Sequence, residues 1–487
     1  MATAHVLVFP FPIQGHINCM LHFATTLVDA GVHVTFLHTE HNLRRLGGRA
    51  SSAAGSPRLR FLAVPDGLPD DHPRSASALP ELYKSLAAGA TGPYRALLAP
   101  SSIGTSLAAG AGVDLTGGFP PVTCLVADGL LPWAIDVAEE LRVPAIVFRT
   151  ASAGSFLAFL SAPKLFELGE LPFPAGSDLD EPVSGVPGME SFLRRRDLPG
   201  HCRRNDTDDV SPALRALAKL SADASKARAL ILNTTATLER SALAHIAPRM
   251  QDLFAVGPLH RRQRAAAAAR QREDDGCMAW LDGLSDKSVV YASLGSLATI
   301  SREQFTEFFS GLVAAGYPFL WVLRSDMVKA SPDAAALREA VVREAGDGKA
   351  RVVAWAPQRD VLRHRAMGCF LTHAGWNSTL EAVVAGVPTV CRPISSDQQT
   401  NSRFVGAVWR TGLDMKDVCD RAVVERTVRE AMESGEIRRS AQALLHHRKA
   451  PASFLGFRIW ECIGRGAEAS NSKLNFQKKL RMLIQNF

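Results

Sequence analysis

The sequence contains no run of about 18 or more consecutive apolar residues, so it predicts no membrane-spanning helix. Its first residues, MATAHVLVFPF, have neither a positively charged start nor an Ala-x-Ala-like cleavage site, and they indicate a buried first strand rather than a signal peptide. The eight cysteines are scattered, without a Cys-x-x-Cys pair or zinc-type spacing. We therefore expect reduced thiols, a cytoplasmic location and no insertion into a membrane.

Excess charge is also absent from most of the chain. The formal net charge is +7, but residues 446–487 hold eight Lys and Arg against two Glu, and the remainder is nearly balanced. A nucleic-acid-binding protein would spread basic residues over one face of a folded domain. Because the excess lies in a terminal tail, we expect no nucleic-acid partner.

A third absence concerns the first strand. No Gly-x-Gly-x-x-Gly follows it, which argues against a nicotinamide-dependent oxidoreductase. In place of glycines, the segment FPFPIQGHIN brings a histidine, His16, to the start of a predicted helix. By itself such a histidine is more often a structural hydrogen-bonding group than a base or a ligand, so its role is open at this point.

The 487 residues are enough for two or three domains, and short apolar runs alternate with amphipathic stretches throughout. This alternation predicts two Rossmann-like, doubly wound parallel α/β domains that face each other across a cleft. We predict a first domain over 1–257, a low-complexity linker over 258–276 and a second domain over 277–445, followed by an atypical basic tail, 446–487. Strands are predicted at 5–11, 32–37, 59–64, 122–128, 145–150 and 229–234, and at 288–296, 319–324, 351–357, 369–375 and 388–393.

The densest polar pattern lies between residues 355 and 398, where three predicted strands in succession end in polar or aromatic residues. Trp355 and Gln358 could offer a stacking face and an amide edge to a base. His373 precedes a helix predicted to start near Asn377 and Ser378, and a helix N-terminus favours a phosphate group.

Each of these features has a simpler alternative. Ser378-x-x-Glu381 matches a helix capping box, Trp355 alone would more often pack in a core, and His373 alone would more often be structural. Asp397 and Gln398, an adjacent carboxylate and amide, suit the vicinal hydroxyls of a polyol. The combination of all these residues favours a ligand site.

The segment WAPQRDVLRHRAMGCFLTHAGWNSTLEAVVAGVPTVCRPISSDQ resembles the 44-residue signature of the plant family 1 UDP-dependent glycosyltransferases. The stretches FPFPIQGH, LVADGLLPWAIDVAEEL and VVYASLGS are similar to the same family, as is the overall length. The resemblance implies a GT-B fold, with the acceptor bound by the first domain and the UDP-sugar by the second. It assigns UDP-sugar binding to Thr150, Ser296, Trp355, Ala356, Gln358, His373, Trp376, Asn377, Ser378, Glu381, Asp397 and Gln398.

The same resemblance identifies His16 as the catalytic base and Asp128 as its partner. The residues support this independently, because both follow apolar strand-like runs and would lie at one edge of a doubly wound sheet. An imidazole ordinarily titrates near ~6.5, so it can accept a proton at neutral pH. A carboxylate on its other nitrogen would set the tautomer and stabilise the imidazolium.

The activity that the resemblance implies is transfer of glucose from UDP-glucose to a hydroxyl or carboxyl of a lipophilic plant small molecule, with inversion to a β-glucoside. Gln398 at the end of the signature favours glucose. We expect no metal ion or other cofactor, since no Asp-x-Asp pair accompanies the donor segment. We expect a monomer, and we expect the acceptor pocket to come from loops such as the apolar stretch 152–174.

The tail departs from the family pattern. After residue 445 the sequence lacks the Gly-Gly-Ser-Ser stretch and the final helix that usually cross back to the first domain. This leaves a second hypothesis from another functional class, namely a homologue that binds nucleotide sugars but turns over poorly.

Overall fold

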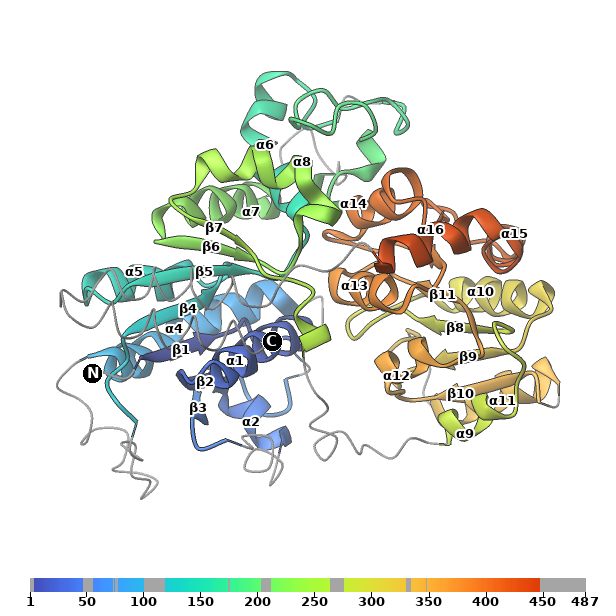
Figure 1. The fold of residues 1–487 in the computed structure, drawn as a ribbon, viewed down its shortest axis with the longest axis horizontal. Coiled ribbons are helices and arrows are strands. Elements are labelled where there is room, and N and C mark those ends of the chain that lie inside the picture. Colours follow the sequence, from blue (N-terminus) through green and yellow to red (C-terminus); the bar gives the residue numbers. More distant parts are fainter. Residues whose placement is uncertain are drawn as a thin grey trace.

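The computed structural model describes residues 4–46, 56–72, 74, 78–99, 119–173, 176–202, 212–262, 276–329, 334–346 and 348–446. These residues form two parallel sheets with helices on both faces, as predicted (Figure 1). The tail from residue 447 onward, and residues 263–275 of the predicted linker, lie outside the described residues.

The first sheet has seven strands in the order β3-β2-β1-β4-β5-β6-β7. All of its strand pairs are parallel, and β1 lies between β2 and the central strand β4. Its strands are β1 (His5–Phe9), β2 (His33–Thr39), β3 (Leu59–Val64), β4 (Cys124–Asp128), β5 (Ala145–Arg149), β6 (Ala229–Leu232) and β7 (Leu253–Ala255).

The second sheet has six parallel strands in the order β10-β9-β8-β11-β12-β13. Its strands are β8 (Val289–Ser293), β9 (Phe319–Val322), β10 (Ala350–Val353), β11 (Met367–Thr372), β12 (Thr389–Cys391) and β13 (Gly412–Asp414). In both sheets the strand order reverses beside the first strand of the domain, where doubly wound folds bind their ligands.

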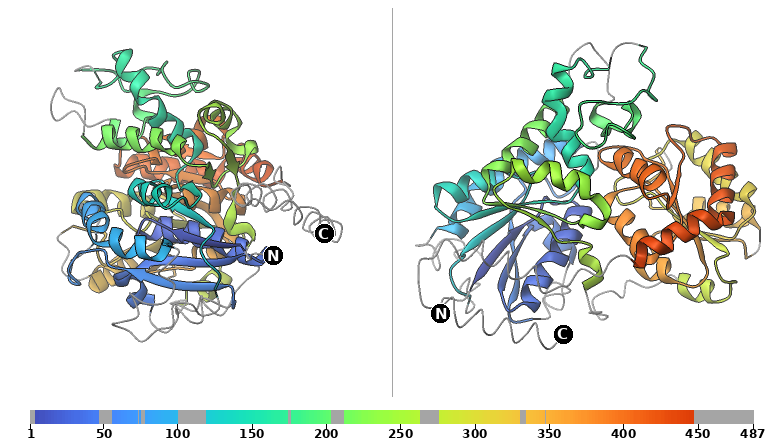
Figure 2. Two further views of the ribbon diagram at one scale, coloured as in Figure 1. Left: turned by 90° about the vertical axis from the view of Figure 1, so that its left-hand side faces the viewer. Right: turned by 45° about the horizontal axis from the view of Figure 1, so that its top comes forward.

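Helices cover both faces of each sheet (Figure 2). Those of the first domain are α1 (Gln14–Asp29), α2 (Glu40–Leu46), α4 (Leu79–Leu98), α5 (Pro132–Glu140), α6 (Ala153–Glu167), α7 (Pro212–Asp223) and α8 (Ala236–Ile246). Those of the second are α9 (Cys277–Asp282), α10 (Arg302–Ala315), α11 (Ala334–Ala345), α12 (Gln358–Arg363), α13 (Trp376–Ala385), α14 (Gln398–Arg403), α15 (Arg421–Glu433) and α16 (Gly435–His446).

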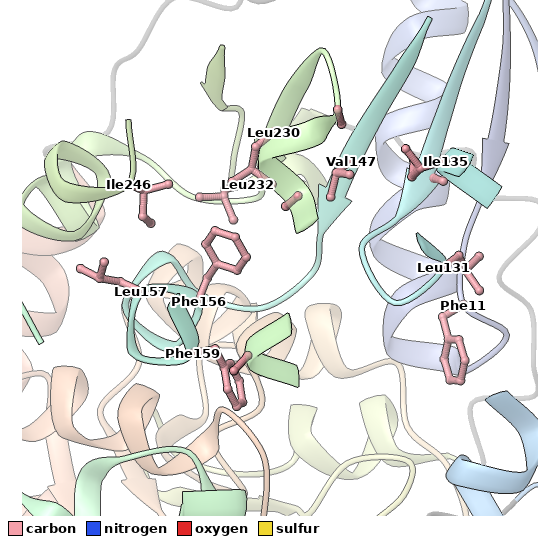
Figure 3. Packing of buried hydrophobic residues seen from close by; sticks show 14 of the residues in the cluster. Phe11, Leu131, Ile135, Val147, Phe156, Leu157, Phe159, Leu230, Leu232 and Ile246 are labelled. Atoms are coloured by element: carbon pink, nitrogen blue, oxygen red, sulfur yellow. The ribbon is translucent and has the colours of Figure 1, made fainter. Parts of the chain in front are cut away.

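The central strands are apolar along their whole length because both of their faces are covered. All five residues of β1, β4 and β5 are buried. Alternate side chains enter different cores, so Leu7 packs with the α4–α6 side and Val8 packs with the α1 side. Phe156 of α6 reaches toward Leu230 and Leu232 of β6 in the former core (Figure 3).

Two short strands were not predicted, and both lie at the edge of a sheet. β7 and β13 have three residues each, and the sequence around them lacks a longer apolar run. Their strand structure depends on pairing with β6 and β12 rather than on local pattern. The other strands lie within or next to the predicted ranges.

The apolar stretch 152–174 differs from the prediction. The sequence predicts a loop there, but residues 153–167 form helix α6. Ser152 caps this helix by accepting a hydrogen bond from the Ser155 N–H. Ten residues of α6 are buried, because its apolar side chains fill the core under β5 and β6.

The two domains contact each other through the carboxyl-end edges of their sheets. Trp376 of α13 donates its indole N–H to the Asn233 carbonyl oxygen at 2.9 Å. Trp409 donates in the same way to the Leu238 carbonyl oxygen at 3.0 Å. Because these bonds fix the helices of the second domain beside β6 and α8, the ends of the two sheets face each other.

Candidate active site

The first group of the site is a histidine–aspartate pair in the first domain. His16 is the third residue of α1, and Asp128 is the last residue of β4. Since β1 and β4 are neighbours in the sheet, the loop after β1 brings the start of α1 over the end of β4. His16 Nδ1 lies 2.5 Å from Asp128 Oδ2, so the structure brings the predicted pair together.

The Asp128 carboxylate is almost fully buried and is held on three sides. Besides His16, it accepts hydrogen bonds from the N–H groups of Phe11 (3.2 Å) and Leu130 (3.0 Å). Burial alone would raise the pKa of Asp128, but His16, the Leu130 N–H and the charge of Arg149 hold it below its usual value. An ionised carboxylate at this position favours the tautomer with the proton on Nδ1, which leaves the lone pair of Nε2 as a base.

Thr150 completes this part of the site. Its Oγ1 lies 3.2 Å from both ring nitrogens of His16. The preceding residue, Arg149, was not predicted as part of the site. Only 5 % of Arg149 is exposed, and its Nε and Nη1 have no hydrogen-bond partner among the residues that the structure describes. Its charge interacts with Asp128 and, from the second domain, with Asp397.

The second group lies at the ends of β10 and β11. Gln358, the first residue of α12, donates hydrogen bonds to Ser378 Oγ (3.1 Å) and Glu381 Oε2 (2.7 Å) of α13. The Tyr291 hydroxyl donates to Gln358 Oε1 at 3.2 Å. Three predicted residues from two strand ends are thus in direct contact, next to the half-buried Trp355 and the buried Ala356.

The capping-box interpretation of Ser378 and Glu381 is wrong. Helix α13 begins at Trp376, its N-cap is Gly375, and no side chain caps it. Ser378 therefore lies inside the first turn and cannot be the N-cap, and both side chains contact Gln358 instead. The first-turn N–H groups have no capping side chain, as a phosphate-binding helix start requires.

His373 lies between two glycines at the end of β11. A Cβ atom on Gly295 or on Gly375 would come within 2.4 Å of its ring, so only glycine leaves room for the imidazole. Burial, aided by the charge of Arg324, lowers the pKa of His373 to about 4. At neutral pH the ring is uncharged and can donate one N–H to an anionic oxygen. The exposed Ser296 follows Gly295 in the same turn.

Asp397 and Gln398 stand at the start of α14, on a loop after β12. Gln398 Oε1 accepts hydrogen bonds from the N–H groups of Ile394 (2.8 Å) and Ser395 (3.0 Å), which leaves its NH₂ group for a ligand. Asp397 Oδ2 accepts from Asn401 Nδ2 at 2.9 Å. Burial raises the pKa of Asp397.

Two residues that the sequence predicts to bind the UDP-sugar make hydrogen bonds between the domains. Asn377 Nδ2 donates to the carbonyl oxygen of Gly15, next to His16, at 2.7 Å. The Trp376 side chain is only 4 % exposed and donates to Asn233, so a contact with a sugar would have to come from its backbone. These bonds place the start of α13 directly opposite the start of α1.

Glu239 and Asn233 also shape the site and were not predicted. Glu239 accepts the N–H groups of Ala153 (3.0 Å) and Gly154 (2.8 Å) at the start of α6, and burial raises its pKa. Neither residue belongs to a recognisable motif. Arg149 could have been found, because a charged residue ends an otherwise apolar predicted strand.

No group of three or more His, Cys, Asp or Glu that could hold a metal ion occurs in the part of the chain that the structure describes. Over the same residues, every helix is too short or too polar to cross a membrane.

Comparison with known proteins gives consistent results. A family model described as UDP-glucoronosyl and UDP-glucosyl transferase matches residues 220–446. The chain is 45 % identical over 440 residues to the myricetin 3-O-rhamnoside 1,2-glucosyltransferase UGT709G2 of Crocosmia x crocosmiiflora, covering 89 % of this chain and 88 % of the relative. It is 42 % identical over 444 residues to the 7-deoxyloganetic acid glucosyltransferase of Catharanthus roseus, covering 88 % and 89 %.

The structure is also similar to solved structures. Os79 from O. sativa, in complex with U2F and trichothecene, matches with a TM-score of 0.71 and 28 % identity, over 95 % of this chain and all of that one. A UDP-glucose:anthocyanidin 3-O-glucosyltransferase in complex with UDP matches with a TM-score of 0.78 over 96 % of this chain and all of that one, and its 23 % identity supports the fold alone. The chain therefore belongs to the plant family 1 UDP-dependent glycosyltransferases, and its two parallel-sheet domains have the GT-B fold of that family.

Proposed function

We propose that this protein transfers glucose from UDP-glucose to a hydroxyl or carboxyl of a small molecule, with inversion at the anomeric carbon. The observation that carries the proposal is the His16–Asp128 pair, directly opposite the start of α13. A base on one side of the domain junction and a phosphate-binding helix end on the other suit an in-line displacement between two bound substrates.

In this mechanism His16 Nε2 takes the proton of the acceptor as its oxygen attacks the anomeric carbon. The new carbon–oxygen bond forms on the face opposite the diphosphate, while the bond from that carbon to the phosphate oxygen breaks. One displacement converts an α-linked donor into a β-glucoside and releases UDP. General-base assistance typically contributes ~10²–10⁴-fold, and alignment of the two substrates contributes much of the remainder.

The departing diphosphate would be stabilised by the second domain. The first-turn N–H groups of α13, near Asn377 and Ser378, carry the positive end of the helix dipole, and neutral His373 adds a donor. We propose that these groups make a metal ion unnecessary. Turnover that persists undiminished in excess EDTA supports this, and loss of turnover that Mg²⁺ or Mn²⁺ restores contradicts it.

The identity of the sugar and of the acceptor is supported differently. The relatives at 45 % and 42 % identity are both named glucosyltransferases, which together with Gln398 favours glucose. The acceptors in their names are myricetin 3-O-rhamnoside and 7-deoxyloganetic acid. The lipophilic character of the acceptor, inferred from the apolar stretch 152–174, loses support, because residues 153–167 form α6 and the buried side chains of this helix fill a core.

The decisive experiment incubates the full chain with UDP-glucose and a panel of hydroxyl- and carboxyl-bearing acceptors. UDP release and product mass are measured for the wild type and for His16→Ala. His245→Ala, at an exposed position of α8, is the matched control. We expect the His16 variant to lose at least ~10²-fold in turnover and the control to lose none. An equally active His16→Ala protein would disprove the mechanism.

The second hypothesis, an inefficient sugar-nucleotide binder, concerns the tail that lies outside the described residues. UDP-glucose binding without product over the whole panel would favour it. The monomeric state and the cytoplasmic location also stay proposals, which sedimentation analysis and cell fractionation would test.

A further inference from the structure

The loop that carries Asp397 and Gln398 is held in an unusual backbone conformation. We call residues Ser395–Gln398 the sugar turn. Ser396 has φ of +61°, in the left-handed region that is energetically costly for a residue with a side chain. The Gln398 side chain folds back onto the N–H groups of Ile394 and Ser395. A turn with this cost persists only when its surroundings hold it.

What holds the sugar turn comes from the first domain. We call residues Asp197–Cys202 the clamp segment. The Gly200 N–H donates to the carbonyl oxygen of the left-handed residue, Ser396, at 2.9 Å. Thr400, two residues after the sugar turn and fully buried, donates its hydroxyl to the Asp197 carbonyl oxygen at 2.7 Å. These two bonds join segments that are about 200 residues apart in the chain.

The clamp segment is itself rigidly placed. The Asp197 side chain is 2 % exposed and accepts from Arg194 Nε and Nη2, both at 2.8 Å. Arg403, from the helix that follows the sugar turn, lies 3.3 Å from the same carboxylate and donates to the Phe192 carbonyl oxygen at 2.6 Å. Buried, charge-assisted bonds of this kind are among the stronger polar contacts in proteins.

The packing at the contact leaves no spare room. A Cβ atom on Gly200 would lie 3.2 Å from the Ser396 nitrogen and 3.4 Å from Gln399 Nε2. Any larger residue at position 200 must therefore push the sugar turn by a few tenths of an ångström. The clamp segment thus acts on the backbone that orients Asp397, and its contacts given above are with the sugar turn and the start of α14.

We propose that Gly200 and Thr400 are positioning residues for the donor sugar, so that the acceptor domain sets the geometry in which Asp397 and Gln398 bind a hexose. The inference rests on the proposed function, in which these two side chains bind the sugar of UDP-glucose. Its consequence is that sugar affinity and sugar selectivity depend on the clamp segment, whereas UDP affinity does not.

The test uses Gly200→Ala and Thr400→Val in the full chain. Gly92→Ala is the matched control for the first, because a Cβ on Gly92 meets nothing within 4 Å. Thr306→Val, on the exposed face of α10, is the control for the second. Thr400→Ser, which keeps the hydroxyl, is the rescue variant. For each protein we would measure the Kd of UDP and of UDP-glucose by calorimetry, and kcat/KM with UDP-glucose, UDP-galactose and UDP-xylose.

For Gly200→Ala and Thr400→Val we expect UDP affinity within about twofold of the wild type. We expect the kcat/KM for UDP-glucose to fall about five- to fiftyfold, with a loss of preference over the other two sugars. Thr400→Ser and both controls should retain wild-type selectivity. Thermal unfolding of each variant checks that the protein is folded.

Parallel weakening of UDP and UDP-glucose binding would overturn the inference, as would unchanged selectivity in both folded variants. If Thr400→Val does not fold, the sugar selectivity of Gly200→Ala relative to Gly92→Ala decides whether the inference holds. Failure of the proposed function looks different, because the wild type would then neither bind UDP-glucose nor release UDP from it.

Discussion

Replacing Asp128 by Asn changes one carboxylate oxygen of the proposed catalytic pair to an NH₂ group and tests the role of the carboxylate most directly. In the wild type Asp128 Oδ2 serves both His16 Nδ1 and the Phe11 N–H, and Oδ1 serves the Leu130 N–H. If the new NH₂ group faces His16, the ring must turn its Nδ1 lone pair toward it, and Nε2 then carries the proton. A protonated Nε2 cannot act as the base.

If the amide flips, the tautomer is preserved but the Leu130 N–H loses its acceptor, which costs about 1–3 kcal/mol of folding stability. The imidazolium formed during reaction loses its counter-ion in either orientation. At 4 Å and an effective dielectric constant near 20, such a pair is worth about 4 kcal/mol. Since 1.36 kcal/mol is tenfold in rate, kcat should fall roughly 10²- to 10⁴-fold.

The assay is the initial rate of UDP release at saturating UDP-glucose and acceptor, alongside the Kd of UDP. Because Asp128 lies in the first domain, the Kd of UDP should change less than about twofold. The double variant His16→Ala/Asp128→Asn should be about as slow as His16→Ala alone, since residues acting as one unit are not additive. An Asp128→Asn protein that keeps a third of its turnover, or full additivity in the double variant, would refute the reasoning.

Three further predictions concern stability and nucleotide binding. Burial lowers the pKa of His38 to about 4, so acidification from pH 6.5 toward 4 lowers the free energy of unfolding. His38→Leu removes this penalty, and in urea unfolding its stabilising effect should be about 1.3 kcal/mol larger at pH 5.5 than at pH 7.5. An equal effect at both pH values contradicts this. Gly412→Ala places a Cβ 2.0 Å from the Thr389 carbonyl oxygen and should lower the free energy of unfolding by at least ~2 kcal/mol. Gly92→Ala should lower it far less, because a Cβ there meets nothing within 4 Å. Equal losses for the two variants in urea unfolding would contradict the steric argument. The family resemblance implies that Glu381 binds the UDP-sugar, and we propose that its carboxylate accepts a ribose hydroxyl. Glu381→Gln should then weaken UDP binding roughly tenfold in calorimetry, and an unchanged Kd of UDP would contradict this role.

Most of the strand pattern could be predicted, because strands covered on both faces are apolar along their length. The two exceptions, β7 and β13, are three-residue edge strands that exist by pairing with a neighbour. Stretch 152–174 was misinterpreted for a related reason. Its apolar content predicts a loop that lines a pocket, whereas in α6 the same side chains fill the core under β5 and β6.

Part of the candidate site was also within reach of the sequence. His16 and Asp128 each follow a buried run, and parallel strands deliver their carboxyl ends to one edge of a sheet, so the 2.5 Å contact follows from topology. The capping-box interpretation failed because the first helical residue is Trp376, two positions before Ser378, and local pattern does not resolve helix ends so finely.

The amino-acid sequence by itself therefore determined the fold class, the family and the chemistry that can meet at the strand ends, because burial and motif are written in neighbouring residues. The tertiary structure alone decided which polar groups meet across the domain junction. Asn377 reaches Gly15, Trp376 reaches Asn233, and Thr400 reaches Asp197, over separations of 143 to 362 residues. Such contacts depend on how two folded sheets dock, and no local pattern encodes the docking.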